Sequence, residues 1–149
     1  MALAGEYEPS PWDFVAEQVR VYEATGGAEG DLLDGKPCVI LTTRGRRTGK
    51  LRKTPLMRVE HDGEYAVVAS MGGAPKHPIW YLNLEANPDV TLQDGPTVMD
   101  LRARTATPEE KREWWPHAVA AWPDYEKYQA STERDIPVVL FEERADPGS

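Results

Sequence analysis

Short apolar runs rich in β-branched residues, separated by tight turns, constrain the fold of this chain most strongly. Six such runs predict strands at 37–43, 51–60, 64–71, 89–94, 97–105 and 136–143. Asp62-Gly63 and Gly95-Pro96 are turn signals that join neighbouring runs as hairpins. Hairpins imply antiparallel pairing, because parallel strands need long crossovers. About six antiparallel strands of mixed burial hide their edges best by closing into a barrel.

Helices are expected on the flanks of this sheet. The first spans about residues 11–25, begins at Ser10-Pro11 and ends at Gly26-Gly27. Others are expected at 79–87, after the capping box that starts at Thr107, and at 124–131. Pro116 and Pro123 are expected to interrupt the third helix. The sequence therefore predicts a mainly β fold with flanking helices (α+β), in a single domain over residues 1–149.

The composition is typical of a protein that folds in water, with 40% hydrophobic and 28% charged residues. Cys38 is the single cysteine, so no internal disulfide is expected, and its apolar neighbours predict that it is buried. We find neither a transmembrane span nor a signal peptide, and expect a cytoplasmic protein. Trp12, Phe14 and Val15 would allow peripheral contact with the inner face of the membrane, but packing on the barrel explains them better.

A cluster of cations is the most unusual feature of the sequence. The segment TTRGRRTGKLRKTP, residues 42–55, contains no acid and six cations: Arg44, Arg46, Arg47, Lys50, Arg52 and Lys53. The net charge of the chain is −8, so the rest of the chain carries −14. The turn GRRTG can present backbone amides, and arginine forks match phosphate and carboxylate oxygens. The segment therefore predicts a site for an elongated anion; a charged hairpin that resists edge aggregation is the alternative.

A second candidate site follows the third predicted strand, in ASMGGAPKHPIWYLN, residues 69–83. The strand ends near Ser70, and two glycines allow the backbone to approach a ligand closely. Trp80 and Tyr81 begin the next helix, beside which a flat aromatic ligand could lie. Taken alone, the segment is better explained as a flexible loop followed by two core aromatic residues.

Aromatic residues also recur in segment 114–128. Trp115, Val119 and Trp122 share one helical face, and Tyr125 and Tyr128 are three residues apart. Such stripes usually belong to a core. The two prolines beside them nevertheless indicate a lid or a pocket wall, from which a tyrosine hydroxyl could donate to a substrate oxygen.

Other kinds of site and partner have little support. The three histidines, His61, His77 and His117, lack the spacing of metal ligands, and one cysteine gives no zinc pattern, so no metal site is expected. The negative net charge argues against nucleic acid as a partner, since phosphate attraction dominates duplex binding. The oligomeric state stays open.

Three segments together resemble one known family. LTTRGRRTGKLRKTPL, VVASMGGAPKHPIWYLNLEANPDV and ATPEEKREWWPHAVAAWPDYEKYQASTERDIPVV are similar, in this order, to the deazaflavin-dependent nitroreductases and F420H2-dependent quinone reductases of actinobacteria. The resemblance covers about residues 37–140. It implies a split β-barrel of the flavin-reductase, FMN-binding type. It also implies an oxidoreductase that uses the reduced deazaflavin coenzyme F420 to transfer a hydride to quinones, nitroaromatics or activated enones.

The resemblance also implies roles for individual residues. The phosphate and glutamate tail of F420 would be held by Arg46, Arg47, Thr48, Arg52 and Lys53, and the ring system bordered by Thr54 and Pro55. The deazaflavin pocket would be lined by Val68, Ala69, Ser70, Met71, Ile79, Trp80, Tyr81 and Asn83. The substrate side would be walled by Met57, Trp122, Tyr125 and Tyr128. The candidate catalytic residues are Ser70, Tyr125 and Tyr128, whose hydroxyls could stabilise charge on a substrate oxygen.

Three residues depart from the family pattern. Met71 stands where relatives often have lysine, Met57 where a pocket tyrosine can occur, and Trp122 in place of a possible tyrosine. Because these changes lie mainly on the substrate side, we expect F420 use with weak or absent reduction of nitro prodrugs. An FMN-dependent enzyme of the same barrel type and a non-catalytic F420 carrier are the alternatives. The length of the basic segment favours the long F420 tail over the FMN phosphate.

Overall fold

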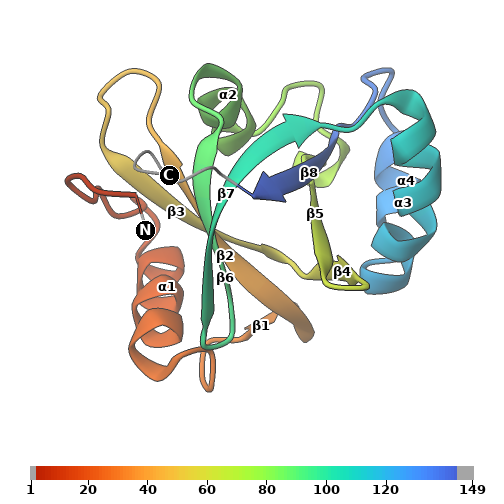
Figure 1. Cartoon of the computed structure of the whole chain (residues 1–149). Coiled ribbons are helices and arrows are strands. Elements are labelled where there is room, and N and C mark those ends of the chain that lie inside the picture. Colours follow the sequence, from red (N-terminus) through yellow and green to blue (C-terminus); the bar gives the residue numbers. More distant parts are fainter. Residues whose placement is uncertain (1–2, 144–149) are drawn as a thin grey trace.

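One curled antiparallel sheet forms the centre of the protein (Figure 1). The computed structural model describes residues 3–143, within which eight strands belong to this sheet. They are β1 (Leu32–Leu33), β2 (Lys36–Arg44), β3 (Leu51–Met57), β4 (Val59–His61), β5 (Glu64–Val68), β6 (Asp89–Asp94), β7 (Thr97–Thr105) and β8 (Val138–Glu143). Their order is β1-β2-β6-β7-β8-β5-β4. β3 pairs with β2 on the edge opposite β6. All of these strand pairs are antiparallel, as the hairpin turns predict.

The two ends of the sheet are joined by a single residue. β4 is the last strand at one end of the order and β3 pairs with β2 near the other end, yet Arg58 alone separates β3 and β4 in the chain. The sheet must therefore curl until its ends meet. The Arg58 amide donates to Pro37 O at 3.0 Å, and its guanidinium lies 3.0 Å from Asp94, so this corner is fixed by both groups. The predicted split β-barrel with flanking helices is confirmed.

Three strand predictions need correction. The strand expected over 51–60 is divided at Arg58, and the one expected over 64–71 ends at Val68. β1 (Leu32–Leu33) lies outside the six predicted runs, so the described residues form eight strands and not about six. The missed signal is Asp34-Gly35, whose positive φ angles of 49° and 78° form the same hairpin turn as Asp62-Gly63.

The helices are α1 (Asp13–Thr25), α2 (Ile79–Ala86), α3 (Pro108–Ala121) and α4 (Tyr125–Ala130), with a 3-10 turn η1 (Met71–Gly73). α1 begins two residues later than expected, because Ser10 Oγ accepts from the amide of Trp12 ahead of the helix. Pro116 does not interrupt α3: it lies on the exposed side, where the lost backbone hydrogen bond is tolerated. No helix within residues 3–143 is both long and apolar enough to cross a membrane.

The barrel interior and its outer faces have separate cores. The interior core contains Val39, Leu41, Val67, Ala69, Trp80, Tyr81, Leu84, Val90, Leu92, Leu101, Ala103 and Val139. α1 packs on the outside of β2, where Val19 and Tyr22 contact Cys38 and Ile40. α3 and α4 cover the outside of β5 and β8 on the opposite flank (Figure 1). α2 contributes to the interior core and lies at the top of the barrel, so it positions the side chains described next.

Candidate active site

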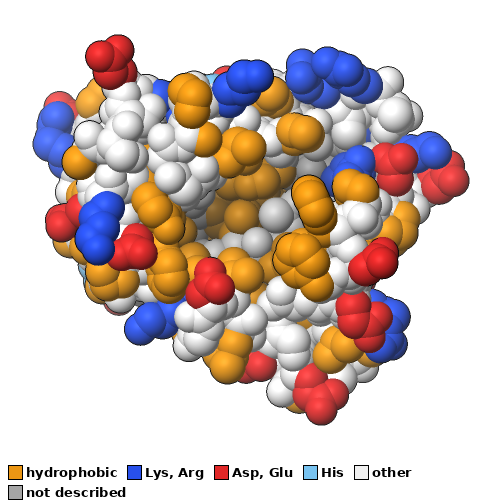
Figure 2. Space-filling model, turned by 180° about the vertical axis from the view of Figure 1, so that it is seen from behind, with side chains coloured by type: hydrophobic (Ala, Val, Ile, Leu, Met, Phe, Trp, Pro, Cys, Tyr) orange, Lys and Arg blue, Asp and Glu red, His pale blue; other side chains and the backbone are white. Residues whose placement is uncertain are grey.

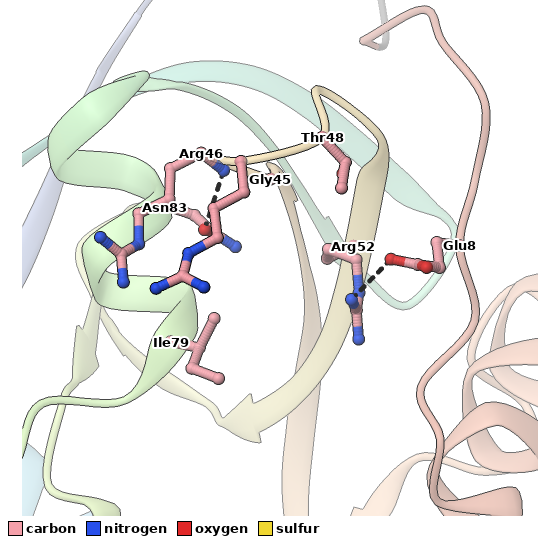
Figure 3. Close-up of a pocket in the computed structure, with 8 residues that line it drawn as sticks. Glu8, Gly45, Arg46, Thr48, Arg52, Ile79 and Asn83 are labelled. Atoms are coloured by element: carbon pink, nitrogen blue, oxygen red, sulfur yellow. Dashed lines mark hydrogen bonds and ion pairs between the residues drawn. The ribbon is translucent and has the colours of Figure 1, made fainter.

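A pocket of about 310 Å³ lies between the turn after β2 and the beginning of α2 (Figure 3). It is lined by Glu8, Gly45, Arg46, Arg47, Thr48, Arg52, Ile79 and Asn83. Figure 2 shows that the face behind the sheet is hollowed, with mostly hydrophobic side chains in the hollow and Lys and Arg side chains along its upper rim. This face thus combines an apolar depression with Lys and Arg side chains above it and Asp and Glu side chains below it.

Asn83 fixes the basic turn on α2. Its side chain is 3% exposed; Oδ1 accepts from the Arg46 amide at 3.1 Å, and Nδ2 donates to Thr43 Oγ1 at 3.5 Å. The amides of Gly45 and Gly49 also bond within the turn. The turn therefore differs from the expected nest of free amides, because its own hydrogen bonds occupy most of them. An anion here would therefore bind mainly to the side chains.

The six cations of residues 44–53 do not act alike. Four are held by other groups: Arg44 by the carbonyl oxygens of Ala4 and Gly49, Lys50 by Glu6 at 4.0 Å, Arg52 by Glu8 at 2.8 Å, and Lys53 by Glu23 at 2.5 Å. Arg46 and Arg47 are exposed and have no acidic partner among the described residues. These two guanidiniums are the cations that the pocket can offer directly to a ligand.

The other residues predicted to contact the tail and ring of the coenzyme lie on β3, and their side chains point to both faces of this strand. Arg52 lines the pocket, whereas Lys53 points the other way, toward Glu23 and the ring of Tyr7 at 4.8 Å. The structure therefore does not bring Lys53 to this pocket. Thr54 is half-buried in the same strand and Pro55 is buried, and neither lines the pocket.

The loop after β5 is clamped by Arg134. Its guanidinium donates to the carbonyl oxygens of Ala69 (3.0 Å), Ser70 (2.7 Å) and Ala74 (3.0 Å) and lies 2.9 Å from His77 Nδ1. Burial lowers the pKa of the Arg134 guanidinium. The guanidinium nevertheless donates to all three of these carbonyl oxygens. The clamp fixes the backbone on both sides of η1 and so holds Ser70 in place.

The two glycines of this loop have different environments. A Cβ added to Gly73 would lie 2.5 Å from Ser131 Oγ and 2.9 Å from Tyr128 O, so Gly73 allows η1 to pack on α4. Nothing lies within 4 Å of the same position at Gly72. The two glycines were expected to let a ligand approach the backbone closely. At Gly73 that space is occupied by α4, whereas at Gly72 it is open. Met71, at φ 47°, is 55% exposed beside them.

α2 does not present all of its predicted residues to a ligand. Ile79 is 71% exposed and lines the pocket together with Asn83. Trp80 and Tyr81 are buried in the interior core, and the Tyr81 hydroxyl is hydrogen bonded to Thr105 Oγ1 at 2.7 Å. This burial agrees with the explanation of the two rings as core residues, and their contact with a ligand stays a prediction.

The predicted substrate-side residues are brought together. Met57, Tyr125, Trp122 and Tyr128 belong to one hydrophobic cluster, which also contains Val68. The Tyr125 and Tyr128 rings are 6.2 Å apart, and Trp122 Nε1 donates to the Tyr128 hydroxyl at 3.3 Å. α4 packs against η1, so this cluster lies beside the Ser70 loop. Residues from β3, β5 and α4 therefore meet at one place.

The hydroxyls of Ser70 and Tyr125 stand out chemically. Both side chains are at least nine-tenths buried, and neither hydroxyl has a hydrogen-bond partner among the described residues. Since no fully buried side-chain oxygen or nitrogen within residues 3–143 lacks a partner, both hydroxyl oxygens keep some accessible surface. Burial, with a smaller contribution from Tyr128, raises the pKa of the Tyr125 phenol. Tyr125 is therefore a neutral hydroxyl that can donate to a ligand.

The three histidines do not form one group. His61 stacks on His117 at 4.1 Å on the α3 side, and His77 contacts Arg134. Across residues 3–143, no group of three or more His, Cys, Asp or Glu side chains is arranged to hold a metal ion. The described surface thus offers an anion pocket and hydroxyl groups and no cluster of metal ligands.

Comparison with known proteins identifies the family. The family described as F420H(2)-dependent quinone reductase matches residues 14–143. The chain belongs to this family. An F420H(2)-dependent quinone reductase of Mycobacterium tuberculosis is 35% identical over 133 residues, which cover 83% of this chain and 86% of the relative.

Solved structures agree with this membership of the F420H(2)-dependent quinone reductase family. The F420-H2 dependent reductase FDR-A is 53% identical, with a TM-score of 0.67 over 71% of this chain and 94% of that chain. A structure described as a domain-swapped dimer is 48% identical, with a TM-score of 0.70 over 89% of this chain and 100% of that chain.

In this member of the F420H(2)-dependent quinone reductase family, sequence reasoning missed two residues that shape the site. Arg134 clamps the Ser70 loop from a distance of 64 residues, and Glu8 lines the pocket from a segment before α1. Glu8 lies outside the three segments that resemble the family, and Arg134 lies in the third of them without a residue pattern that indicates its role. The excess of acid outside the basic segment is the one signal that some of its cations would be paired.

Proposed function

We propose that this protein is an oxidoreductase that uses reduced F420 to reduce quinones. The observation that carries the proposal is the pair Arg46 and Arg47, guanidiniums on the wall of a pocket that have no acidic partner within residues 3–143 of an otherwise acidic protein. The match to the F420H(2)-dependent quinone reductase family over residues 14–143 supports the choice of coenzyme and acceptor.

The donor set fits a phosphodiester with a glutamate tail. Arg46 and Arg47 are free to form paired hydrogen bonds with phosphate oxygens, and Thr48 adds a hydroxyl. Arg52 is the next cation along the same wall and can take a tail carboxylate. Lys53 makes no direct contact in the pocket, because it is paired with Glu23 on the other face of β3. It adds only to the positive electrostatic potential there.

The reacting end of the coenzyme is assigned to the region around Ser70. When bound, reduced F420 supplies a hydride, and the protein supplies orientation and electrostatics. The apolar cluster of Met57, Val68 and Trp122 excludes water beside it. Quinone reduction adds a hydride and a proton and places negative charge on oxygen. The Tyr125 hydroxyl, kept neutral by burial, and that of Ser70 are the proposed donors to this oxygen.

The alternatives lose support. Neither the family description nor the relatives named above refers to FMN, and a carrier would have no use for donor hydroxyls beside the ring site. Nitroaromatics and enones are secondary acceptors in this proposal. With Met57 and Trp122 in place of hydroxyl-bearing rings, we propose that nitro compounds are reduced more slowly than quinones.

A fluorescence titration with F420, run beside FMN, tests the coenzyme. The wild-type protein is expected to bind F420 alone, and the double variant Arg46→Ala/Arg47→Ala to bind it about tenfold or more weakly, because two charge-assisted contacts are lost. Lys50→Ala is the matched control, since Lys50 faces Glu6 outside the pocket. Menadione reduction with F420H2 then tests the activity. Preferential binding of FMN, or binding without turnover of any quinone, would refute the proposal.

A further inference from the structure

The segment before α1 is held along β3 in an extended form. The Glu8 amide donates to Leu51 O at 2.9 Å, and the Leu51 amide donates to Glu6 O at 2.7 Å. Side chains alternate along such a segment. Tyr7 accordingly contacts Lys53 on one face of β3, and Glu8 reaches Arg52 on the other.

This arrangement places a carboxylate inside the cationic pocket. Glu8 Oε2 lies 2.8 Å from Arg52 Nη1, and both side chains line the same pocket as Arg46, Arg47 and Thr48 (Figure 3). The Glu8 and Arg52 side chains are 42% and 34% exposed, and an ion pair this accessible contributes little to folding. Because the pair lies where an anionic ligand must enter, it affects the binding of that ligand.

A ligand anion in this pocket meets opposite effects from its walls. Arg46 and Arg47 attract it, whereas the Glu8 charge is within a screening length and repels it. Arg52 has donors left, but the edge that faces Glu8 is occupied. A carboxylate tethered to a phosphate already bound at Arg46 and Arg47 has a high effective concentration, so it can displace Glu8 where a free monoanion cannot.

We propose that Glu8 is a specificity-determining residue of the anion pocket. Its carboxylate serves as the internal counter-anion of Arg52, so the pocket yields Arg52 to a chain of linked negative charges and withholds it from small anions. The inference rests on the proposed use of F420, whose tail is such a chain, but the contact itself belongs to the pocket and can be tested without the coenzyme.

The test is calorimetric titration with inorganic diphosphate and fluorescence titration with F420. Glu8→Gln keeps the shape and removes the charge, and is expected to bind diphosphate about two- to fivefold more tightly at low salt, the effect of a partly exposed charge. Its gain for F420 should be smaller, because the tethered tail already displaces Glu8 in the wild type. The gain should vanish near 1 M salt. It should also vanish when Arg52→Ala is added to Glu8→Gln. Glu6→Gln, which removes a carboxylate outside the pocket, should bind like the wild type.

The outcomes of these titrations decide whether Glu8 determines the specificity of the pocket. Unchanged or weaker diphosphate binding by Glu8→Gln, with an unchanged melting temperature, overturns the inference and makes Glu8 a positioning group for Arg52. A gain that persists without Arg52 also overturns it. If the wild type binds diphosphate but not F420, the proposed function fails while the diphosphate series still decides the role of Glu8.

Discussion

Arg134 Nη2 lies 2.7 Å from the carbonyl oxygen of Ser70, and the same guanidinium bonds the carbonyl groups of Ala69 and Ala74. One side chain close to the C-terminal strand thereby sets the path of the loop that carries a candidate catalytic hydroxyl. A planar fork with several donors is suited to this task, and the ammonium of lysine is not.

Replacing Arg134 should therefore loosen the Ser70 loop. Arg134→Ala is expected to lower the free energy of unfolding by about 1–3 kcal/mol, because three carbonyl groups lose a charged donor. Urea denaturation measures this, and hydrogen exchange should accelerate at residues 69–74. Arg102→Ala is the control, since Arg102 is exposed and its distance to Asp89 is 3.8 Å. A loss below about 0.5 kcal/mol for Arg134→Ala would contradict the clamp.

Asn83 allows a paired test of the basic turn. Asn83→Ala removes the acceptor of the Arg46 amide and should cost about 1–3 kcal/mol of stability. Asn83→Asp keeps an acceptor there but adds a negative charge beside the pocket. The Asp variant should therefore be nearer the wild type in thermal denaturation and yet bind F420 more weakly than the wild type at low salt. Wild-type affinity of the Asp variant would show that Asn83 lies outside the field of the bound anion.

Tyr125→Phe separates catalysis from binding. Removing the hydroxyl should reduce quinone turnover about tenfold or more while the Kd of F420 changes less than twofold, because the ring still fills the cluster. Burial raises the pKa of this phenol above its ordinary value of 10.0, so the hydroxyl stays protonated and its contribution should not decline between pH 7 and 10. Tyr65→Phe, which loses a hydroxyl bonded to Asp94, is the control. Loss of F420 affinity alone would remove Tyr125 from the chemistry.

The first turn of α3 gives a pH prediction. The Arg104 guanidinium, and then the Thr107 amide, lower the pKa of Glu110 to about 2. A carboxyl group with a lowered folded-state pKa stabilises the protein above its unfolded value near 4.5, and this stabilisation is lost as the pH falls toward 2. Melting temperatures between pH 7 and 3 should fall less steeply for Glu110→Gln than for the wild type. Glu109→Gln, in the same turn, should keep the wild-type slope.

Local signals predicted the fold well where a turn and two short strands are neighbours in the chain. Asp62-Gly63, the capping box at Thr107 and the end of α1 at Gly26 all occur as predicted. Pro116 was misjudged, because the cost of proline in a helix depends on whether its side faces solvent, which local sequence does not show.

The candidate site was less predictable, since it depends on contacts between distant segments. Charge patterning located Arg46 and Arg47, but the pairing of Arg52 with Glu8 spans 44 residues and has no motif. The rings of Trp80 and Tyr81 fit a ligand wall and a core equally well by type. Their burial is decided by how α2 closes the barrel, which is a property of the whole sheet.

The place of β8 in the strand order also bears on how the protein is made. β8 lies between β7 and β5, so no strand pairs with the facing edges of β5 and β7 until residues 138–143 have been synthesised. During translation the nascent chain therefore exposes two unpaired strand edges, which favour aggregation. Arg134 is added just before β8, so the Ser70 loop acquires its clamp in the same late step. Within residues 3–143, the loop that carries the candidate hydroxyl of Ser70 is thus among the last parts to fold.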